Sequence, residues 1–180
     1  WKLLEWFKEN RGKSETKLAI NSNLGMDDKK IKEFIEAIRD VPDIELYTSC
    51  EALNEQAEYI RDGLVFDDWA NNVERLLDSG KFRGLHSMCT INALCLDSLD
   101  SYLEMVHNWK IEYGKDAINF SLNILRFPSF QSPLVLPDSI RFDYCCKLQR
   151  WFDDHADSEF LHEYERNQLQ RLIDYLNTVK

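Results

Sequence analysis

Short apolar segments alternate with segments of helical periodicity along most of this chain. Between the apolar runs, apolar residues recur at i, i+3, i+4 and i+7, as they do over residues 31–38, which is the pattern of a buried helix face. Strands separated by helices pair in parallel through right-handed crossovers, so the sequence predicts an α/β fold with a parallel sheet. The predicted strands are residues 17–23, 44–48, 85–91 and 117–125.

Helices are predicted before the first strand, between the strands, and twice after the last strand. This order suits a doubly wound sheet or part of a (β/α) barrel. No Gly-rich phosphate loop follows any predicted strand, which disfavours a nucleotide-binding doubly wound fold. Because helical periodicity begins at once at Trp1, we expect the chain to be a fragment that starts inside a fold. Residues 53–61 are predicted to form a short helix or an ordered loop. The other predicted helices are residues 1–9, one capped by Asp27 and Asp28, one capped by Asp67 or Asp68, one that starts at Asp97 or Ser98 and ends near Gly114, one from Asp138 to about Asp154, and one capped by Ser158.

Composition excludes several classes of function. Lys plus Arg number 22 and Asp plus Glu number 32, so the net charge of −10 argues against a nucleic-acid-binding protein. No apolar run approaches the ~20 residues of a membrane span. The five cysteines lack the spacing of a disulfide framework, so we expect reduced thiols and a cytoplasmic location.

Neither the cysteines nor the histidines form a metal-binding pattern in the sequence. No CxxC or CxxxC spacing occurs, and the thiols are interpreted as packing residues. His155 and His162 are seven residues apart, whereas two ligands on one helix face would be three or four apart. His86 and His107 have no partner at close spacing, so no metal site is predicted within the chain.

Polar residues follow or close each predicted strand. In parallel α/β folds, ligands bind at the carboxyl ends of the strands. One polar strand end is an ordinary turn, but four at matching positions favour a shared site. The candidate site residues are Asn21, Asn23, Ser49, Glu51, Thr90, Asn92 and Arg126, to which we add Arg61.

Glu51 and the two arginines suggest what such a site could bind. A carboxylate can accept two hydroxyl hydrogens of a ribose diol, and Ser49 could add one more hydrogen bond. Arg61 and Arg126 could each hold a carboxylate in fork geometry. Two alternatives remain open: Arg61 could form a surface ion pair with Glu58 or Asp62, and the Asn residues could serve only as turn residues.

Several stretches, taken in order and spacing, resemble radical S-adenosylmethionine (SAM) proteins, notably the twitch-domain members common in phage and metagenomic sequence. The resemblance covers roughly residues 1–150. It rests on LAINSNLG (18–25), TSCEA (48–52), EYIRDG (58–63), WANNVERLL (69–77), MCTINAL (88–94), ILRFP (124–128) and QSPLVLP (131–137).

The resemblance implies a partial (β/α)6 barrel. The four strands of this chain would be barrel strands three to six, with residues 1–137 forming the later part of the barrel core and residues 138–180 a helical extension. The cluster-binding CxxxCxxC loop and the Gly-Gly-Glu segment that meets the methionine amino group are not in the sequence. The cofactors implied are SAM and a 4Fe–4S cluster whose ligands lie outside these 180 residues.

The resemblance also assigns roles to the candidate residues. Ser49 and Glu51 match the position that contacts the SAM ribose, and Arg61 matches a segment that often reaches the SAM carboxylate. By the same matching, Asn21 and Asn23 lie beside the cofactor, Thr90 and Asn92 near the adenosyl group, and Arg126 at the end of strand six. The loop of residues 126–137, with Phe127, Phe130 and Gln131, would border the substrate.

The function implied is that of a radical SAM enzyme fragment, which contributes SAM and substrate contacts. Its partners would be SAM, an unknown substrate and an electron donor to the whole protein, and the fragment alone is expected to be inactive. One alternative is a catalytically retired α/β module that binds protein partners through its acidic helices. Another is a complete flavodoxin-like or nucleotide-binding domain.

Overall fold

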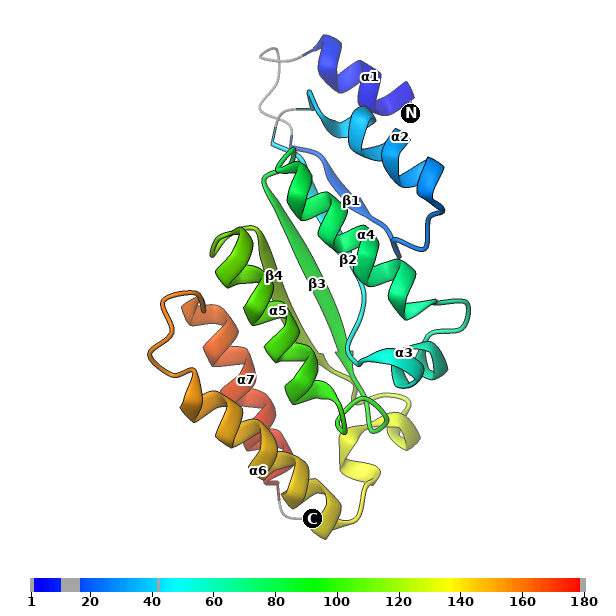
Figure 1. The fold of residues 1–180 in the computed structure, drawn as a ribbon. Coiled ribbons are helices and arrows are strands. Elements are labelled where there is room, and N and C mark those ends of the chain that lie inside the picture. Colours follow the sequence, from blue (N-terminus) through cyan, green and yellow to red (C-terminus); the bar gives the residue numbers. More distant parts are fainter. Residues whose placement is uncertain (1, 11–16, 42, 179–180) are drawn as a thin grey trace.

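The computed structural model describes residues 2–10, 17–41 and 43–178. Its described strands form one four-stranded parallel sheet in the order β1-β2-β3-β4 (Figure 1). This confirms the predicted α/β fold with a parallel sheet. The strands are β1 (Ala19–Asn21), β2 (Glu45–Thr48), β3 (Gly84–Ile91) and β4 (Ile118–Ile124).

Every strand of the sheet pairs with its neighbour along the chain. A doubly wound sheet reverses its strand order at a switch point, and the four described strands have no such reversal. The sequential order therefore disfavours a flavodoxin-like fold and matches the winding of a (β/α) barrel.

Helices fill the crossovers and follow the last strand. Figure 1 shows α4 and α5 side by side on the near side of the sheet, with α6 and α7 packed together beyond β4. No described helix has the length and apolar character needed to span a membrane. The helices are α1 (Lys2–Glu9), α2 (Asp28–Ile38), α3 (Asn54–Ile60), α4 (Phe66–Ser79), α5 (Leu99–Tyr113), α6 (Asp138–Asp154) and α7 (Glu163–Leu176), with 3-10 turns η1 (Ser129–Gln131) and η2 (Pro133–Val135).

Local hydrogen bonds explain where two helices begin. The Asp27 carboxylate accepts the Lys30 backbone N–H at 2.8 Å and caps α2, as predicted. The prediction that Asp67 or Asp68 caps α4 is wrong, because both lie in its first turn. There they interact favourably with the positive end of the helix dipole.

The start of α7 also differs from the prediction. The helix begins at Glu163 rather than directly after Ser158, whose hydroxyl accepts the Phe160 backbone N–H in a local turn. The Glu165 carboxylate accepts the His162 backbone N–H at 2.9 Å and so satisfies the residue that precedes the helix. The residue that precedes α7 is therefore His162, not Ser158, and Glu165 is the acidic residue that pairs with it.

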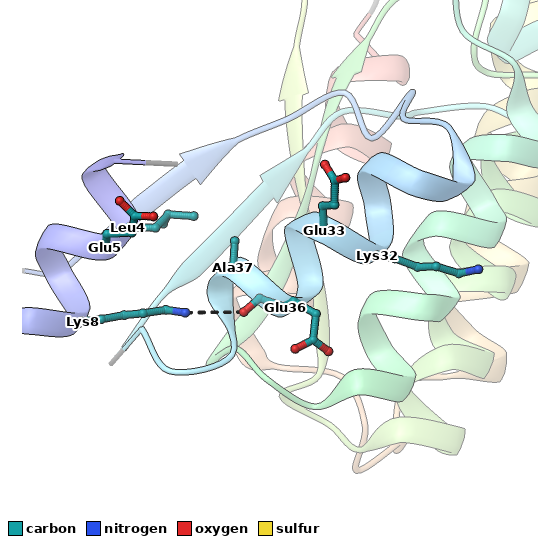
Figure 2. Close-up of a pocket in the computed structure, with 7 residues that line it drawn as sticks. All are labelled: Leu4, Glu5, Lys8, Lys32, Glu33, Glu36 and Ala37. Atoms are coloured by element: carbon teal, nitrogen blue, oxygen red, sulfur yellow. Dashed lines mark hydrogen bonds between the residues drawn. The ribbon is translucent and has the colours of Figure 1, made fainter.

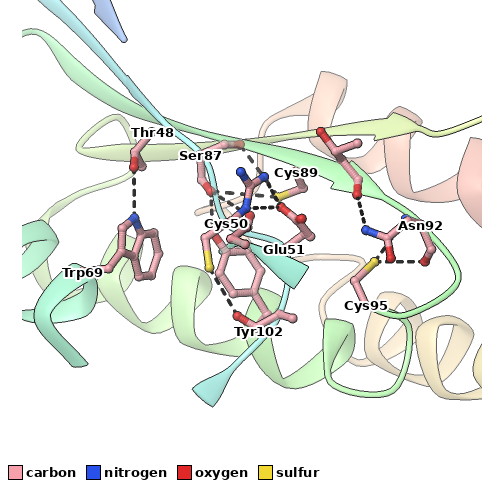
Figure 3. Close-up of polar contacts among 12 residues, drawn as sticks. Thr48, Cys50, Glu51, Trp69, Ser87, Cys89, Asn92, Cys95 and Tyr102 are labelled. Carbon is pink, nitrogen blue, oxygen red and sulfur yellow. Dashed lines mark hydrogen bonds and ion pairs between the residues drawn. The ribbon is translucent and has the colours of Figure 1, made fainter. Parts of the chain in front are cut away.

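One face of the sheet packs against α4 and α5. Two polar contacts cross this layer: Trp69 Nε1 on α4 donates to Thr48 Oγ1 at 2.9 Å, and the Ser87 hydroxyl bonds the Tyr102 hydroxyl on α5 (Figure 3). The rest of this face is apolar and buried in the core. Its residues are Leu46, Leu85, Cys89, Ile91, Phe120 and Leu122.

The alternate residues of the same strands form a second face, which we call the polar face. Most of them are half-buried or exposed, although Gly84 and Asn119 on the same side are buried. Parallel sheets are ordinarily covered on both faces. Across this face, Asn21 is in register with Tyr47, and Tyr47 is in register with His86. The rings of Tyr47 and His86 stack with their centroids 4.7 Å apart. The polar face comprises Tyr47, His86, Met88, Thr90, Ser121 and Asn123.

Side chains of α7 cover the outer edge of β4. The backbone N–H groups of Phe120 and Leu122 donate to the side-chain oxygens of Glu165 and Gln168, and Arg171 donates to the Leu122 carbonyl at 2.8 Å. These groups replace a neighbouring strand, so the edge is not left open for association. They also attach α7 to the sheet.

Candidate functional site

A pocket of about 790 Å³ lies at the carboxyl ends of β2 and β3, and we call it the rim pocket. Small-molecule sites commonly measure ~300–1,000 Å³. Four of the eight predicted site residues line the rim pocket: Glu51, Arg61, Thr90 and Asn92. Apolar and aromatic residues complete it, among them Tyr59, Ile60, Leu94, Phe130 and Leu136.

Glu51 and Arg61 form an ion pair in the wall of the rim pocket. Arg61 Nε lies 3.0 Å from Glu51 Oε2, and Arg61 Nη2 bonds the same oxygen. The Glu51 side chain is 3% exposed and the Arg61 side chain 27%, so the guanidinium is the more accessible partner. The alternative of a surface pair between Arg61 and Glu58 or Asp62 is wrong, because the guanidinium pairs with the buried Glu51 instead. Glu58 accepts the Phe66 backbone N–H at 2.9 Å.

Burial shifts the ionisation of Glu51. Removal from water raises the pKa of this carboxyl, while the hydrogen bond and charge of Arg61 and the Thr90 backbone N–H act in the opposite direction. Because burial is the largest effect, the carboxylate form is destabilised relative to water.

Glu51→Gln is expected to change how stability depends on pH. The folded-state pKa of Glu51 lies above the ordinary 4.5. The proton's contribution to stability is present below pH 4.5 and is lost as pH rises through the raised pKa. Urea unfolding of both proteins at several pH values should show wild type losing stability relative to Glu51→Gln over this range.

The matched control for this pH series is Glu55→Gln, which removes an exposed carboxylate on α3. The pH series of Glu51→Gln is compared with that of this variant, so that the general effect of removing one negative charge is subtracted. A Glu51→Gln difference that is flat, or that favours wild type as pH rises, would contradict the assigned shift.

Thr90 and Asn92 play different parts at the end of β3. Asn92 Nδ2 donates to the Thr90 carbonyl at 3.1 Å, and Asn92 Oδ1 accepts the Leu94 backbone N–H at 2.8 Å. These bonds make Asn92 a turn residue that shapes the pocket wall. Thr90 is exposed at the mouth of the pocket and lies on the polar face.

A smaller hollow of about 320 Å³ lies next to the rim pocket and shares Ile60 and Arg61 with it. Asn23 and Ser49 line this hollow. Asn23 Oδ1 accepts the Gly25 backbone N–H at 3.1 Å, as expected of a turn residue. Asn21 is exposed on β1 and lines neither space.

Arg126 does not join the other candidate residues. Its guanidinium lies over the ring of Tyr175 on α7, 5.5 Å from the centroid, and it does not line the rim pocket. In the loop predicted to border the substrate, Phe130 and Gln131 line the pocket, while Phe127 does not. The backbone N–H of Ala93 donates to the Gln131 carbonyl at 2.9 Å, which ties this loop to the end of β3.

The cysteines near the site are packing residues. Cys50, Cys89 and Cys95 are buried, and burial raises the pKa of the Cys50 and Cys95 thiols to about 12 and that of Cys89 well above its usual value. Thiols in this state are neither nucleophiles nor ready metal ligands. The described cysteines therefore do not fit the ligand set of an iron–sulfur cluster.

A second space, of about 560 Å³, lies between α1 and α2 (Figure 2). Figure 2 shows Lys8 reaching the Glu36 backbone carbonyl, 3.5 Å away, while Lys32 extends away from that contact. The charged groups around this space do not converge on a common point. The rim pocket is therefore the better candidate site.

One cluster of ligand-type side chains lies outside the rim pocket. One nitrogen or oxygen from each of Glu104, His107 and His155 lies within 4.8 Å of the others. The expectation that His107 has no partner is wrong, because its ring centroid lies 4.5 Å from that of His155. The available signal was Glu104-x-x-His107, which puts a carboxylate and an imidazole on the same helix face.

No family model matches the sequence, and neither a curated protein nor a solved structure matches it. The resemblance to radical SAM proteins therefore stays a prediction.

Proposed function

We propose that this chain is the later half of a (β/α) barrel that binds SAM at the rim pocket and belongs to a radical SAM enzyme. The observation that carries the proposal is the polar face, which leads to the rim pocket at Thr90. Bulky branched residues usually fill the inside of a closed (β/α) barrel. In this sheet the corresponding positions hold Tyr47, His86, Ser121 and Asn123, which suits an interior that receives a polar ligand.

The Glu51–Arg61 pair provides the groups that SAM would require. The amino-acid carboxylate of SAM would pair with the partly exposed Arg61 guanidinium. The ribose hydroxyls of SAM would donate to the Glu51 carboxylate. Binding would thus exchange part of the internal ion pair for contacts to the ligand. Phe130 and Tyr59, both largely exposed at the pocket, would shield the adenine from water.

The cluster of such an enzyme would have to be held by residues outside this chain. The sequence has no CxxxCxxC motif, and the buried, protonated thiols beside Glu51 do not fit a cluster. The chain's own part in the proposal is therefore binding and orientation. The electron donor and the substrate would bind to the whole protein.

The test is calorimetric titration of the chain with SAM and with S-adenosylhomocysteine, an unreactive analogue that lacks the sulfonium methyl group. We expect saturable binding that Arg61→Met weakens about 10- to 100-fold, the equivalent of the ~1.5–3 kcal/mol of a charged hydrogen bond. Arg75→Met is the matched control, because Arg75 also pairs with an acid, Asp28, but lies on α4 away from the pocket. Its affinity should equal that of wild type.

Two results would contradict the proposal. The first is no saturable binding of either ligand by the wild-type chain. The second is equal binding by wild type and Arg61→Met. Either would favour the retired α/β module, in which Glu51 and Arg61 only stabilise the fold.

A further inference from the structure

Glu104, His107 and His155 lie where α5 meets the end of α6. Glu104 and His107 are three residues apart on α5, and His155 is the C-cap of α6. Their ligand atoms lie within 4.8 Å of one another, and His155 Nε2 is 3.1 Å from Glu104 Oε2. The three side chains therefore converge on one point from two helices.

Hydrogen bonding fixes which atom of His155 faces Glu104. His155 Nδ1 lies 2.7 Å from the Trp151 carbonyl, which can only accept, so Nδ1 carries the hydrogen. In the neutral ring, Nε2 then directs a lone pair at the Glu104 carboxylate. Two acceptors at this distance need a proton or a metal cation between them.

His107 supplies a second unsatisfied atom. The residue is 6% exposed, and its Nδ1 is buried with no hydrogen-bond partner among the described residues. Its Nε2 lies 2.8 Å from the Ser158 hydroxyl, which can accept the Nε2 hydrogen and leave a lone pair on Nδ1. A buried polar atom without a partner is unfavourable, and a metal ion bound to Nδ1 would satisfy it.

The surrounding groups orient the three ligands. Trp151 Nε1 donates to Glu104 Oε2 at 2.8 Å, and the Trp151 ring stacks on His155 with centroids 4.3 Å apart. Ser158 and the Trp151 carbonyl hold the far nitrogens of the two histidines. Outer hydrogen bonds of this kind orient the ligands of protein metal sites.

We propose that Glu104, His107 and His155 bind a divalent transition-metal ion, with zinc the best fit, which ties α5 to the end of α6. Two histidines and one glutamate, with a fourth position for water, form an established zinc ligand set. Tetrahedral bonds of ~2.0–2.1 Å require ligand atoms about 3.3 Å apart. The Glu104–His155 pair already meets this distance, and the ligand atom of His107, within 4.8 Å of both, would have to move closer on binding. The proposal does not depend on SAM binding.

The test uses the full chain, stripped with a chelator and then titrated with Co²⁺ and Zn²⁺. We expect one equivalent of Co²⁺ to produce visible d–d absorption, and Zn²⁺ to abolish that absorption and raise the melting temperature. His155→Gln should weaken binding by at least the ~10–100-fold that loss of an outer-shell partner costs. His162→Gln is the matched control, because His162 also contacts a carboxylate, Asp116, at 3.1 Å but lies outside the cluster.

Absence of stoichiometric binding by wild type would overturn the proposal, because it would mean that a proton occupies the space between His155 and Glu104. Binding unchanged in His155→Gln, or lost in His162→Gln, would overturn it as well. His107→Gln gives a second test of the same kind. If His107→Gln, at a buried position, prevents folding, the variants His155→Gln and Glu104→Gln, at half-buried positions, decide the question.

Discussion

Lys110→Met is expected to lower the free energy of unfolding by about 3–5 kcal/mol, the cost of breaking a buried ion pair. Lys110 on α5 and Glu165 on α7 are both 0% exposed, with Nζ 3.0 Å from Oε2. Lys110 also donates to Asn119 Oδ1 at 2.9 Å and to the Lys115 carbonyl at 3.0 Å. Burial lowers the pKa of Lys110, and the neighbouring Glu165 carboxylate acts in the opposite direction.

The double variant Lys110→Met, Glu165→Gln is the informative comparison. It removes both charges and keeps an amide oxygen that can accept the Phe120 N–H, so it should be more stable than Lys110→Met alone. Lys29→Met is the control, because it breaks an exposed pair with Glu33 and should change stability by less than ~1 kcal/mol. Urea unfolding measures all three. A Lys110→Met protein as stable as the control would contradict this assignment.

Trp69→Ala is expected to destabilise the fold by about 3–5 kcal/mol, the usual cost of truncating a buried tryptophan. Trp69 is 0% exposed and lies between Tyr102 and Trp109, with ring centroids 6.2 and 6.1 Å away. Its removal would leave a cavity under β2 and would also remove the hydrogen-bond donor to the Thr48 hydroxyl.

Trp69→Phe separates packing from hydrogen bonding. It retains most of the ring volume but not the indole N–H, so we expect a loss of about 1–3 kcal/mol. Trp6→Ala, at a 50% exposed position on α1, serves as the control and should cost less than ~1 kcal/mol. Chemical denaturation would contradict the account if Trp69→Ala were no more destabilising than Trp69→Phe.

The sequence predicted strands and helices well wherever periodicity was strong. The long strand β4 was predicted as 117–125 and runs from Ile118 to Ile124. β1 was predicted as 17–23 but extends only from Ala19 to Asn21, because the Ser22 hydroxyl accepts the Leu24 backbone N–H and turns the chain. Short-range side-chain bonds of this kind compete with strand pairing and are hard to read from hydrophobicity.

The candidate site was predicted only in part, because side-chain partners depend on tertiary packing. Polar strand ends pointed to Glu51 and Thr90, and the parallel topology brings these residues to one pocket. That Arg61 would pair with Glu51 depends on how α3 packs, which the sequence does not give. Arg126 was expected beside them, but the ring of Tyr175, on a helix far along the chain, lies beneath its guanidinium instead.

The cluster on α5 and α6 shows the same limit. The spacing of Glu104 and His107 is visible in the sequence, but a carboxylate and an imidazole three residues apart are common on helix surfaces. His155 arrives only because α6 packs beside α5. The third ligand therefore could be found only from the fold.

The most direct test of the central claim is an NMR titration of the ¹⁵N-labelled chain with S-adenosylhomocysteine. The account predicts saturable shifts concentrated at residues 49–51, 61 and 90–94, around the rim pocket. Amides of α1 and α2, which border the other large space, should not move. No saturable shifts, or shifts confined to α1 and α2, would contradict the claim that the rim pocket binds a SAM-type ligand.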